Sequence, residues 1–171
     1  MTKRTLLWTF LTLIITAVSA QTVYDVTAFG AKGDGITDDA AAIQQAIDRC
    51  SQEGGGRVLL PRNHIFMAGP IELKSNVELH LEATATLKAN PDEQIYHLSA
   101  FGKNEGEGML WLYANDADNI SITGKGTIHG NGIAFMGAEL EDSYELKPLA
   151  DQAFDPRPHV LTLTDVRRLT I

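Results

Sequence analysis

The stretch Gly69–Ala89, GPIELKSNVELHLEATATLKA, contains three short runs in which apolar and polar residues alternate. The runs lie at residues 71–73, 77–81 and 85–87. Alternation at every second residue is typical of β-strands with one buried face. Short polar turns separate the runs, and none of them is the Asn-Gly or Asp-Gly turn of a tight hairpin. The stretch therefore predicts three strands, which we name a, b and c, that follow one another without pairing as hairpins.

The same cycle of strands recurs along the chain. Strands of type a begin at residues 71, 110 and 161, strands of type b begin at 77, 120 and 169, and strands of type c end near 87 and 128. Long irregular stretches connect the cycles in place of the helices that a doubly wound sheet requires. We therefore expect an all-β solenoid, a right-handed single-stranded parallel β-helix, with the hand taken from the usual handedness of parallel connections. The third cycle stops after its b strand at Ile171, so the chain is expected to be truncated in the third coil.

An α-helix is predicted at about residues 39–52, and it supplies the N-terminal cap of the solenoid. Thr37, Asp38 and Asp39 are candidate N-cap residues, and the glycines at 54–56 end the helix. An uncapped first coil would expose its core, so an amphipathic helix across this end is expected. Its narrow apolar stripe consists of Ile43, Ala46, Ile47 and Cys50. Cys50 is the single cysteine, either a buried thiol of this stripe or one partner of a disulfide completed beyond residue 171.

The glycine-containing loop at residues 30–35 does not predict a phosphate site. It lacks the Gly-Lys-Ser/Thr ending of a P-loop, and Asp38 and Asp39 at the following helix start would repel an anion.

Residues 1–20 have the pattern of a secretory signal peptide. Lys3 and Arg4 precede an apolar run at residues 6–18, and cleavage is expected after Ala20. Residues 21–171 then form the N-terminal portion of a β-helix domain, with 21–56 as capping segment and 57–171 as first coils. A secreted or periplasmic location follows. Loss of two positive charges changes the formal charge from −8 to −10, which argues against nucleic acid and anionic membranes as partners.

Three segments resemble known families. VTAFGAKGDGITDDAAAIQQAIDRC, residues 26–50, resembles the N-terminal motif of the pectate-lyase-like β-helix superfamily, which includes hydrolases, lyases, epimerases and phage tailspikes. The stretch 69–89 and NISITGKGTIHGNG, residues 119–132, resemble the first coils of glycoside hydrolase family 28, the polygalacturonases and their relatives. RPHVLTLTDVRRLTI, residues 157–171, resembles the segment that leads into that family's next coil. The resemblance implies an inverting hydrolase of pectic polysaccharide.

The resemblance also implies where the catalytic residues lie. The family's aspartates belong to Asn-Thr-Asp and Asp-Asp motifs, followed by His-Gly and Arg-Ile-Lys. Asn-Thr-Asp and Arg-Ile-Lys are absent from residues 1–171, so the catalytic set is expected after Ile171, and the chain as given is expected to be inactive. We predict no catalytic residue, no metal site and no cofactor within 1–171. Arg157 and His159 are weak candidates for contacting a sugar carboxylate.

Other acidic residues have simpler interpretations. Asp116 and Asp118 fit a turn, with an incomplete calcium site as the alternative. A solvated face is expected for the acidic residues of the second long loop, Glu139, Glu141, Asp142, Glu145, Asp151 and Asp155.

The expected partner is a pectic polysaccharide, and the complete protein is expected to be a monomer. Long connections at one corner of each coil build walls beside a groove, which suits a long, thin ligand. Two other functions stay open. One is a polysaccharide lyase on the same fold, and the other is a non-catalytic module for glycan binding or adhesion.

Overall fold

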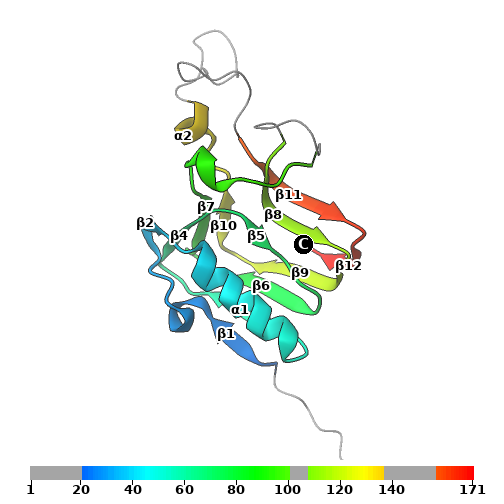
Figure 1. The fold of residues 1–171 in the computed structure, drawn as a ribbon. Helices are drawn as coiled ribbons and strands as arrows, with labels where there is room; N and C mark the ends of the chain where they lie inside the picture. The colour runs from blue at the N-terminus through cyan, green and yellow to red at the C-terminus, as the bar shows by residue number, and fades with distance from the viewer. Residues whose placement is uncertain (1–20, 101–107, 137–156) are drawn as a thin grey trace, which may run out of the picture.

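The structure, a computed structural model, describes residues 21–100, 108–136 and 157–171. Its strands form three sheets whose neighbouring strands all pair in parallel. The chain visits the sheets in the repeated order b, c, a, so that each circuit makes one coil of a parallel β-helix (Figure 1). The all-β solenoid predicted from the strand pattern is confirmed.

Each sheet stacks strands of one type. The b sheet contains, in spatial order, β1 (Val23–Asp25), β3 (Gly56–Leu60), β6 (Val77–Leu81), β9 (Asp118–Gly124) and β12 (Arg167–Thr170). The c sheet contains β2 (Asp34–Asp38), β4 (Ile65–Ala68), β7 (Thr86–Ala89) and β10 (Thr127–His129). The a sheet contains β5 (Ile71–Glu72), β8 (Leu110–Asn115) and β11 (His159–Thr164). The helical elements are η1 (Val26–Phe29), α1 (Ala40–Gln52), η2 (Glu93–Ile95) and α2 (Gly132–Met136).

The structure adds coils that the sequence pattern did not predict. Strands β1 to β4 precede the first predicted strand at residue 71, so the segment 21–56 contributes strands to the solenoid as well as its cap. In β4 the consecutive apolar residues 65–68 hide the alternation that defines a strand. In β2 no side chain is buried, and pairing with β4 provides its strand geometry.

Stacked aliphatic side chains fill the interior of the solenoid. In the b sheet, Val58 lies in register with Leu79, and Leu79 lies in register with Ile122. These three side chains are buried, whereas the outward neighbours of Leu79 and Ile122 are polar. Burying each such aliphatic side chain stabilises the fold by about 1.5–3 kcal/mol.

Helix α1 takes the place of an a strand in the first coil. It follows β2 and packs against η1, β1, β3 and β5. The Gln44 side chain covers the open edge of β5, because its Oε1 accepts from Glu72 N at 2.8 Å and its Nε2 donates to Glu72 O at 3.1 Å. The amide thus replaces the hydrogen bonds of a missing neighbouring strand. The predicted stripe of Ile43, Ala46, Ile47 and Cys50 is fully buried.

The side chain of Asp39 occupies the backbone amides with which the loop before α1 could otherwise bind an anion. Asp39 is the N-cap residue, yet its side chain makes no capping bond and instead accepts from Lys32 N at 2.6 Å and Gly33 N at 3.0 Å. Its carboxylate, which is 2% exposed, therefore fills the space between these amides. The first free amide of the helix, Ala40 N, donates instead to the Asp38 carboxylate at 2.8 Å.

Cys50 is buried and is a free cysteine. Burial raises the pKa of its thiol to about 11, and the nearby Glu53 charge adds to the increase. The thiol therefore stays protonated at neutral pH.

The turns between a and b strands stack in the same way as the strands. Asn76 and Asn119 occupy equivalent positions, both with left-handed backbone conformation (φ 63° and 58°). The Asn119 side chain donates to Asn76 Oδ1 at 3.0 Å. Asp116 also has positive φ, which agrees with the turn interpretation, whereas Asp118 is the first residue of β9 and not part of the turn. Asparagine tolerates this conformation better than other non-glycine residues, so the two amides hold successive coils in step.

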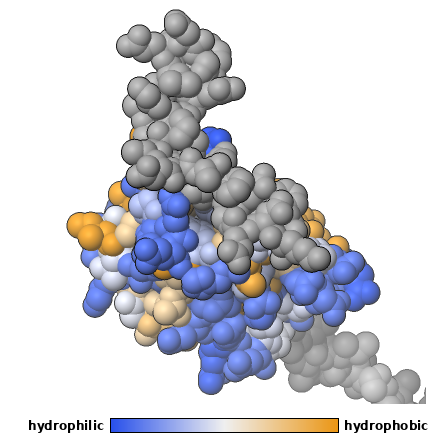
Figure 2. Space-filling model, turned by 45° about the horizontal axis from the view of Figure 1, so that its top comes forward, coloured by the Kyte–Doolittle hydropathy of each residue, from blue (hydrophilic) through white to orange (hydrophobic). Residues whose placement is uncertain are grey.

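The face shown in Figure 2 is mostly hydrophilic, with small separate hydrophobic areas. Across the described residues, no helix is long and apolar enough to cross a membrane.

Candidate functional site

A groove of about 310 Å³ lies on the outer face of the a sheet. Its floor consists of residues of β8 and β11, two neighbouring strands in successive coils. Its wall is the segment Leu98–Ala100. The floor therefore spans two successive coils. The described residues that line it are Leu98, Ser99, Ala100, Leu110, Tyr113, Ala114, Asn115, Thr162 and Thr164.

Backbone hydrogen bonds hold the wall beside the floor. Ser99 and Met109 form an antiparallel bridge. Ala100 N donates to Gly108 O at 2.9 Å, and Leu110 N donates to Leu98 O at 2.8 Å. The wall is thus paired to the segment that enters β8. The described part of this long connection therefore forms a wall beside the groove, as predicted, while binding at this face stays a prediction.

Tyr113 and Thr162 supply the polar chemistry of the groove floor. They face each other in register across β8 and β11. Burial raises the pKa of the Tyr113 phenol, the Glu72 charge raises it further, and Lys74 opposes both. The phenol is therefore a hydrogen-bond donor at neutral pH. The Thr162 Oγ1 atom is buried and has no hydrogen-bond partner among the described residues.

The composition of the groove favours binding over acid–base catalysis. None of its described lining residues is charged. The nearest ion pair, between Lys74 and Glu72, is satisfied internally at 2.5 Å. Aliphatic side chains, a phenol ring, an amide and hydroxyl groups suit a sugar, which has apolar faces and a rim of hydroxyls.

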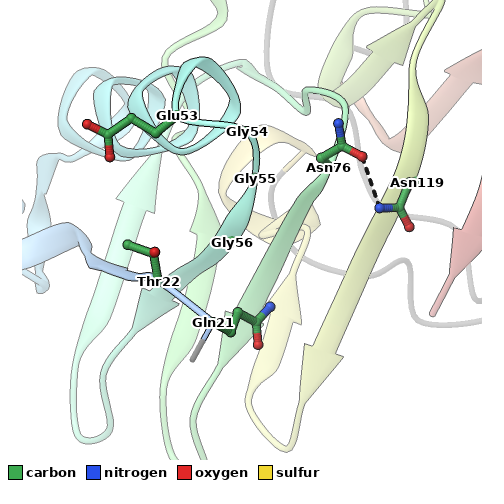
Figure 3. Close-up of a pocket in the computed structure, with 8 residues that line it drawn as sticks. All are labelled: Gln21, Thr22, Glu53, Gly54, Gly55, Gly56, Asn76 and Asn119. Carbon is green, nitrogen blue, oxygen red and sulfur yellow. Dashed lines mark hydrogen bonds between the residues drawn. The ribbon is translucent and has the colours of Figure 1, made fainter. Parts of the chain in front are cut away.

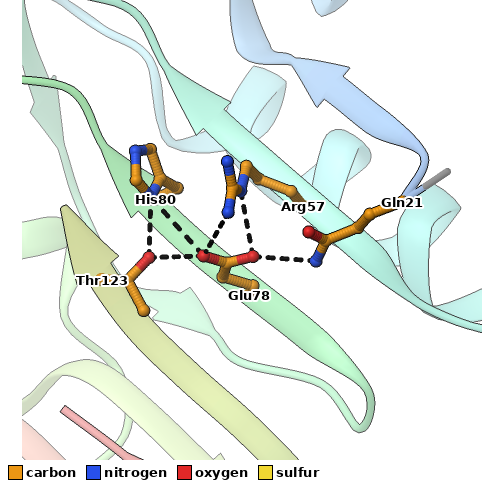
Figure 4. A network of polar contacts seen from close by, with 5 residues as sticks. All are labelled: Gln21, Arg57, Glu78, His80 and Thr123. Atoms are coloured by element: carbon orange, nitrogen blue, oxygen red, sulfur yellow. Dashed lines mark hydrogen bonds and ion pairs between the residues drawn. The ribbon is translucent and has the colours of Figure 1, made fainter.

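A second polar group lies on the outer face of the b sheet, where Glu78 connects four side chains (Figure 4). Arg57 donates to both carboxylate oxygens of Glu78, at 2.9 and 3.0 Å. Thr123 donates at 2.6 Å and Gln21 at 2.8 Å. Although burial raises the pKa of Glu78, the hydrogen bonds from Arg57, Thr123 and Gln21 outweigh it and lower the pKa to about 2. Such a carboxylate stays ionised and cannot act as a general acid near neutral pH.

The same network determines the tautomer of neutral His80. An ionised carboxylate only accepts, so the Thr123 hydroxyl donates its proton to Glu78. The Thr123 oxygen must then accept from His80 Nδ1, which lies 2.7 Å away. His80 lies on the outer face of β6, where it is partly buried and held by these neighbours.

A polar recess of about 430 Å³ adjoins the stacked turns (Figure 3). Its functional groups are largely paired with the protein. Glu53 accepts from Tyr24 at 2.6 Å and pairs with Arg49 at 2.5 Å, while Asn76 accepts from Asn119. The amides of Gly54, Gly55 and Gly56 all donate to backbone carbonyls. The recess therefore lacks the free amides of an anion site. Its lining consists of Gln21, Thr22, Glu53, Gly54, Gly55, Gly56, Asn76 and Asn119.

Of the predicted sugar contacts, His159 is the first residue of β11 and Arg157 lies two residues before it, and both are exposed. Neither is among the described residues that line the groove, and their role stays a prediction. Within the described ranges, no group of three or more His, Cys, Asp or Glu residues is arranged to hold a metal ion. Ala20 and the acidic residues of the second long loop lie outside the described residues.

Two short pairs match the expected family motifs by letter alone. Asp38 and Asp39 form an Asp-Asp pair, but their carboxylates accept from backbone amides beside α1. His129 and Gly130 form a His-Gly pair, and His129 Nδ1 accepts from Asn131 N at 3.0 Å. These contacts give Asp38, Asp39 and His129 local structural roles.

The family model for rhamnogalacturonase A/epimerase, pectate lyase-like, matches residues 23–137. The chain belongs to this family. Membership agrees with the stacked coils and with the capping helix, both of which lie largely within the matched segment.

Curated relatives of this family member include several enzyme types. An exo-poly-alpha-D-galacturonosidase of Dickeya chrysanthemi is 36% identical over 138 residues, 71% of this chain and 21% of the relative. Mannuronan C5-epimerase AlgE2 of Azotobacter vinelandii is 33% identical over 160 residues, 82% of this chain and 16% of the relative. Alginate lyase 7 of the same organism is 32% identical over 160 residues, 82% of this chain and 19% of the relative. The chain thus spans about a fifth or less of these proteins.

Solved structures similar to this chain include polygalacturonases and an adhesin. An exopolygalacturonase from Thermotoga maritima matches 86% of this chain and 40% of its own, with a TM-score of 0.63 and 27% identity. The family 28 exopolygalacturonase of Yersinia enterocolitica matches 66% of this chain and 21% of its own, with a TM-score of 0.58 and 34% identity. The Streptococcus pneumoniae surface adhesin PfbA matches 86% of this chain and 32% of its own, with a TM-score of 0.55 and 28% identity. Resemblance to family 28 polygalacturonases is therefore confirmed.

Sequence reasoning found the floor of the groove only in part. The alternation of leucine and threonine in β11 places Thr162 and Thr164 on the outer face. Tyr113 was missed, although its position between Leu112 and Ala114 carries the same signal. The wall at Leu98–Ala100 has no repeating pattern, and a long-range backbone bridge positions it.

Proposed function

We propose that this chain is the N-terminal portion of a secreted glycoside hydrolase that cleaves pectic polysaccharide of the galacturonan type with inversion. The observation that carries the proposal is the groove on the a sheet, which is lined by neighbouring strands of two successive coils. A chain-like ligand suits a groove that spans more than one coil. The exo-polygalacturonosidase and exopolygalacturonase relatives support pectic substrate and hydrolysis together.

The described residues supply binding rather than bond cleavage in this proposal. Inverting hydrolysis needs two carboxyl groups about 6.5–9.5 Å apart, one to protonate the leaving oxygen and one to activate water. Hydrogen bonds from Arg57 keep Glu78 ionised, and the Asp39 carboxylate accepts from two backbone amides. We assign the catalytic pair to coils that follow Ile171, and we expect no turnover by residues 21–171 alone.

Two other functions have support of their own. The mannuronan epimerases and alginate lyase 7 favour chemistry at C5 of a uronate polymer, with a base in later coils in place of the paired carboxyl groups. The likeness to the adhesin PfbA favours a β-helix that binds without catalysis. All three use the groove as a binding site for a polymer, and they differ in what happens to the glycosidic bond.

The test begins with the coding DNA after codon 171. The complete encoded protein is expressed and incubated with polygalacturonate, rhamnogalacturonan and alginate. Release of reducing ends, with inverted configuration at the new anomeric carbon by NMR, is expected. Ultraviolet absorbance of an unsaturated product would show a lyase instead, and a change of C5 configuration without cleavage would show an epimerase. Binding without any reaction would support the adhesive module and contradict the hydrolase.

A further inference from the structure

Gln21 links the start of the described chain to the b sheet. It is the first residue that the structure describes, two positions before β1. Its side-chain Nε2 donates to Glu78 Oε2 at 2.8 Å, across 57 residues of sequence (Figure 4). If the leader is removed after Ala20, Gln21 becomes the N-terminal residue, and this side chain then has a free α-amino group beside it.

Glu78 is a fixed acceptor for this contact. Its side chain is 15% exposed, and Arg57 and Thr123 hold both carboxylate oxygens. The backbone around Gln21 is also held, because Arg57 N donates to Thr22 O at 2.8 Å. The Gln21 amide therefore extends toward an acceptor whose position the b sheet determines.

An N-terminal glutamine has a characteristic reaction. Its unprotonated α-amino nitrogen attacks the side-chain carbonyl carbon Cδ and forms a new C–N bond that closes a five-membered lactam. The bond from Cδ to Nε2 breaks, and Nε2 leaves as ammonia after taking up the proton that the amine loses. The step requires no oxidant or cofactor. The ordinary pKa of an α-amino group is about 8, so a useful fraction is unprotonated in mildly alkaline solution.

We propose that Gln21 is a cyclisation site whose reaction is restrained by the Glu78 carboxylate. The leaving nitrogen is the atom that Glu78 holds, and the side chain must release this bond before Cδ can fold back onto the α-amine. Cyclisation then removes the donor permanently, because Nε2 is lost. The proposal rests on leader removal after Ala20, which is part of the proposed function, but not on the reaction catalysed.

The test follows the N-terminal peptide of the full-length secreted protein by mass spectrometry during incubation at mildly alkaline pH and 37 °C. Cyclisation appears as loss of one ammonia from the peptide that begins at Gln21. The Glu78→Gln variant is compared with Glu82→Gln as the matched control, because Glu82 pairs with Arg62 and not with Gln21. Wild-type protein unfolded in guanidinium chloride, which leaves the α-amine unmodified, gives the unrestrained rate, and this comparison serves even if Glu78→Gln folds poorly.

The exposed hydrogen bond between Gln21 and Glu78 is expected to change the cyclisation rate by a modest factor. We expect folded wild-type protein and Glu82→Gln to cyclise about 3- to 10-fold more slowly than unfolded protein, and Glu78→Gln to recover most of the difference. Equal rates in folded and unfolded protein, or in the two variants, would overturn the restraint. An N-terminus other than Gln21 would overturn the site itself, while the polysaccharide assay would still decide the proposed function separately.

Discussion

Arg57 and Glu78 lie in register on neighbouring strands of the b sheet and share two hydrogen bonds, of 2.9 and 3.0 Å. The pair joins two successive coils on the outer face of the solenoid. Thr123 extends the connection to a third coil. Outward polar residues thus stabilise the stacking of coils, in addition to the aliphatic column inside.

This network makes stability depend on pH in a defined range. The pKa of Glu78 is about 2 in the folded protein, against about 4.3 when unfolded. As pH falls, the unfolded state binds the proton first, so a contribution on the order of 3 kcal/mol is complete above about pH 5 and is lost between pH 5 and 2. Urea unfolding of wild type and Glu78→Gln across this range measures it. Wild type should lose more stability than the variant, and parallel curves would contradict the prediction.

Gln44 caps the edge of β5 through two hydrogen bonds to the backbone of Glu72, at 2.8 and 3.1 Å. Gln44→Ala leaves this amide and carbonyl without protein partners, and we expect a loss of about 1–3 kcal/mol in the free energy of unfolding. The neighbouring Gln45 is exposed on the same helix, so Gln45→Ala is the control and should change stability by less than about 0.5 kcal/mol. Equal effects would show that helix propensity, rather than edge capping, dominates.

Alanine substitutions at Gly124 and Gly54 allow the cost of a steric clash to be compared with the cost of backbone strain alone. Both have positive φ, 106° and 96°. A Cβ at Gly124 would lie 1.9 Å from the backbone oxygen of Leu81, whereas a Cβ at Gly54 would meet nothing within 4 Å. We expect Gly54→Ala to cost about 1 kcal/mol and Gly124→Ala to cost more than about 3 kcal/mol or to prevent folding. Thermal unfolding of the two variants checks this, and comparable melting temperatures would refute the close approach of the two coils.

Tyr113 tests whether the groove binds the polymer. In the complete enzyme, Tyr113→Ala should raise KM about 3- to 10-fold and leave kcat nearly unchanged, because the residue lies away from the proposed catalytic coils. Tyr113→Phe keeps the ring and removes the hydroxyl, so it shows which part of the side chain binds. A loss of kcat with unchanged KM would place the chemistry in this groove and contradict our assignment.

Much of the fold was predictable because the strand pattern is local. Alternation identified the b strands that begin at residues 77 and 120, the second of which starts two residues earlier in the structure, and the stripe on α1 identified the cap. Strand β2 could not be found in this way, because none of its side chains is buried and pairing with β4 provides its conformation.

The candidate site was less predictable than the fold. Its floor follows from alternation, but its wall depends on a bridge between Ser99 and Met109 that no local pattern encodes. The Asp39 carboxylate was expected to repel an anion from the preceding loop, and the structure shows that it occupies that loop's amides instead.

The sequence by itself determined the solenoid class, the capping helix and the inward or outward direction of most strand residues, because each depends on the spacing of apolar side chains. Only the tertiary structure decided which residues meet across coils. Gln44 covers the edge of β5, Glu78 receives four polar neighbours, and Tyr113 lies opposite Thr162. The register between coils sets these contacts, and register depends on packing of the whole stack rather than on any single strand.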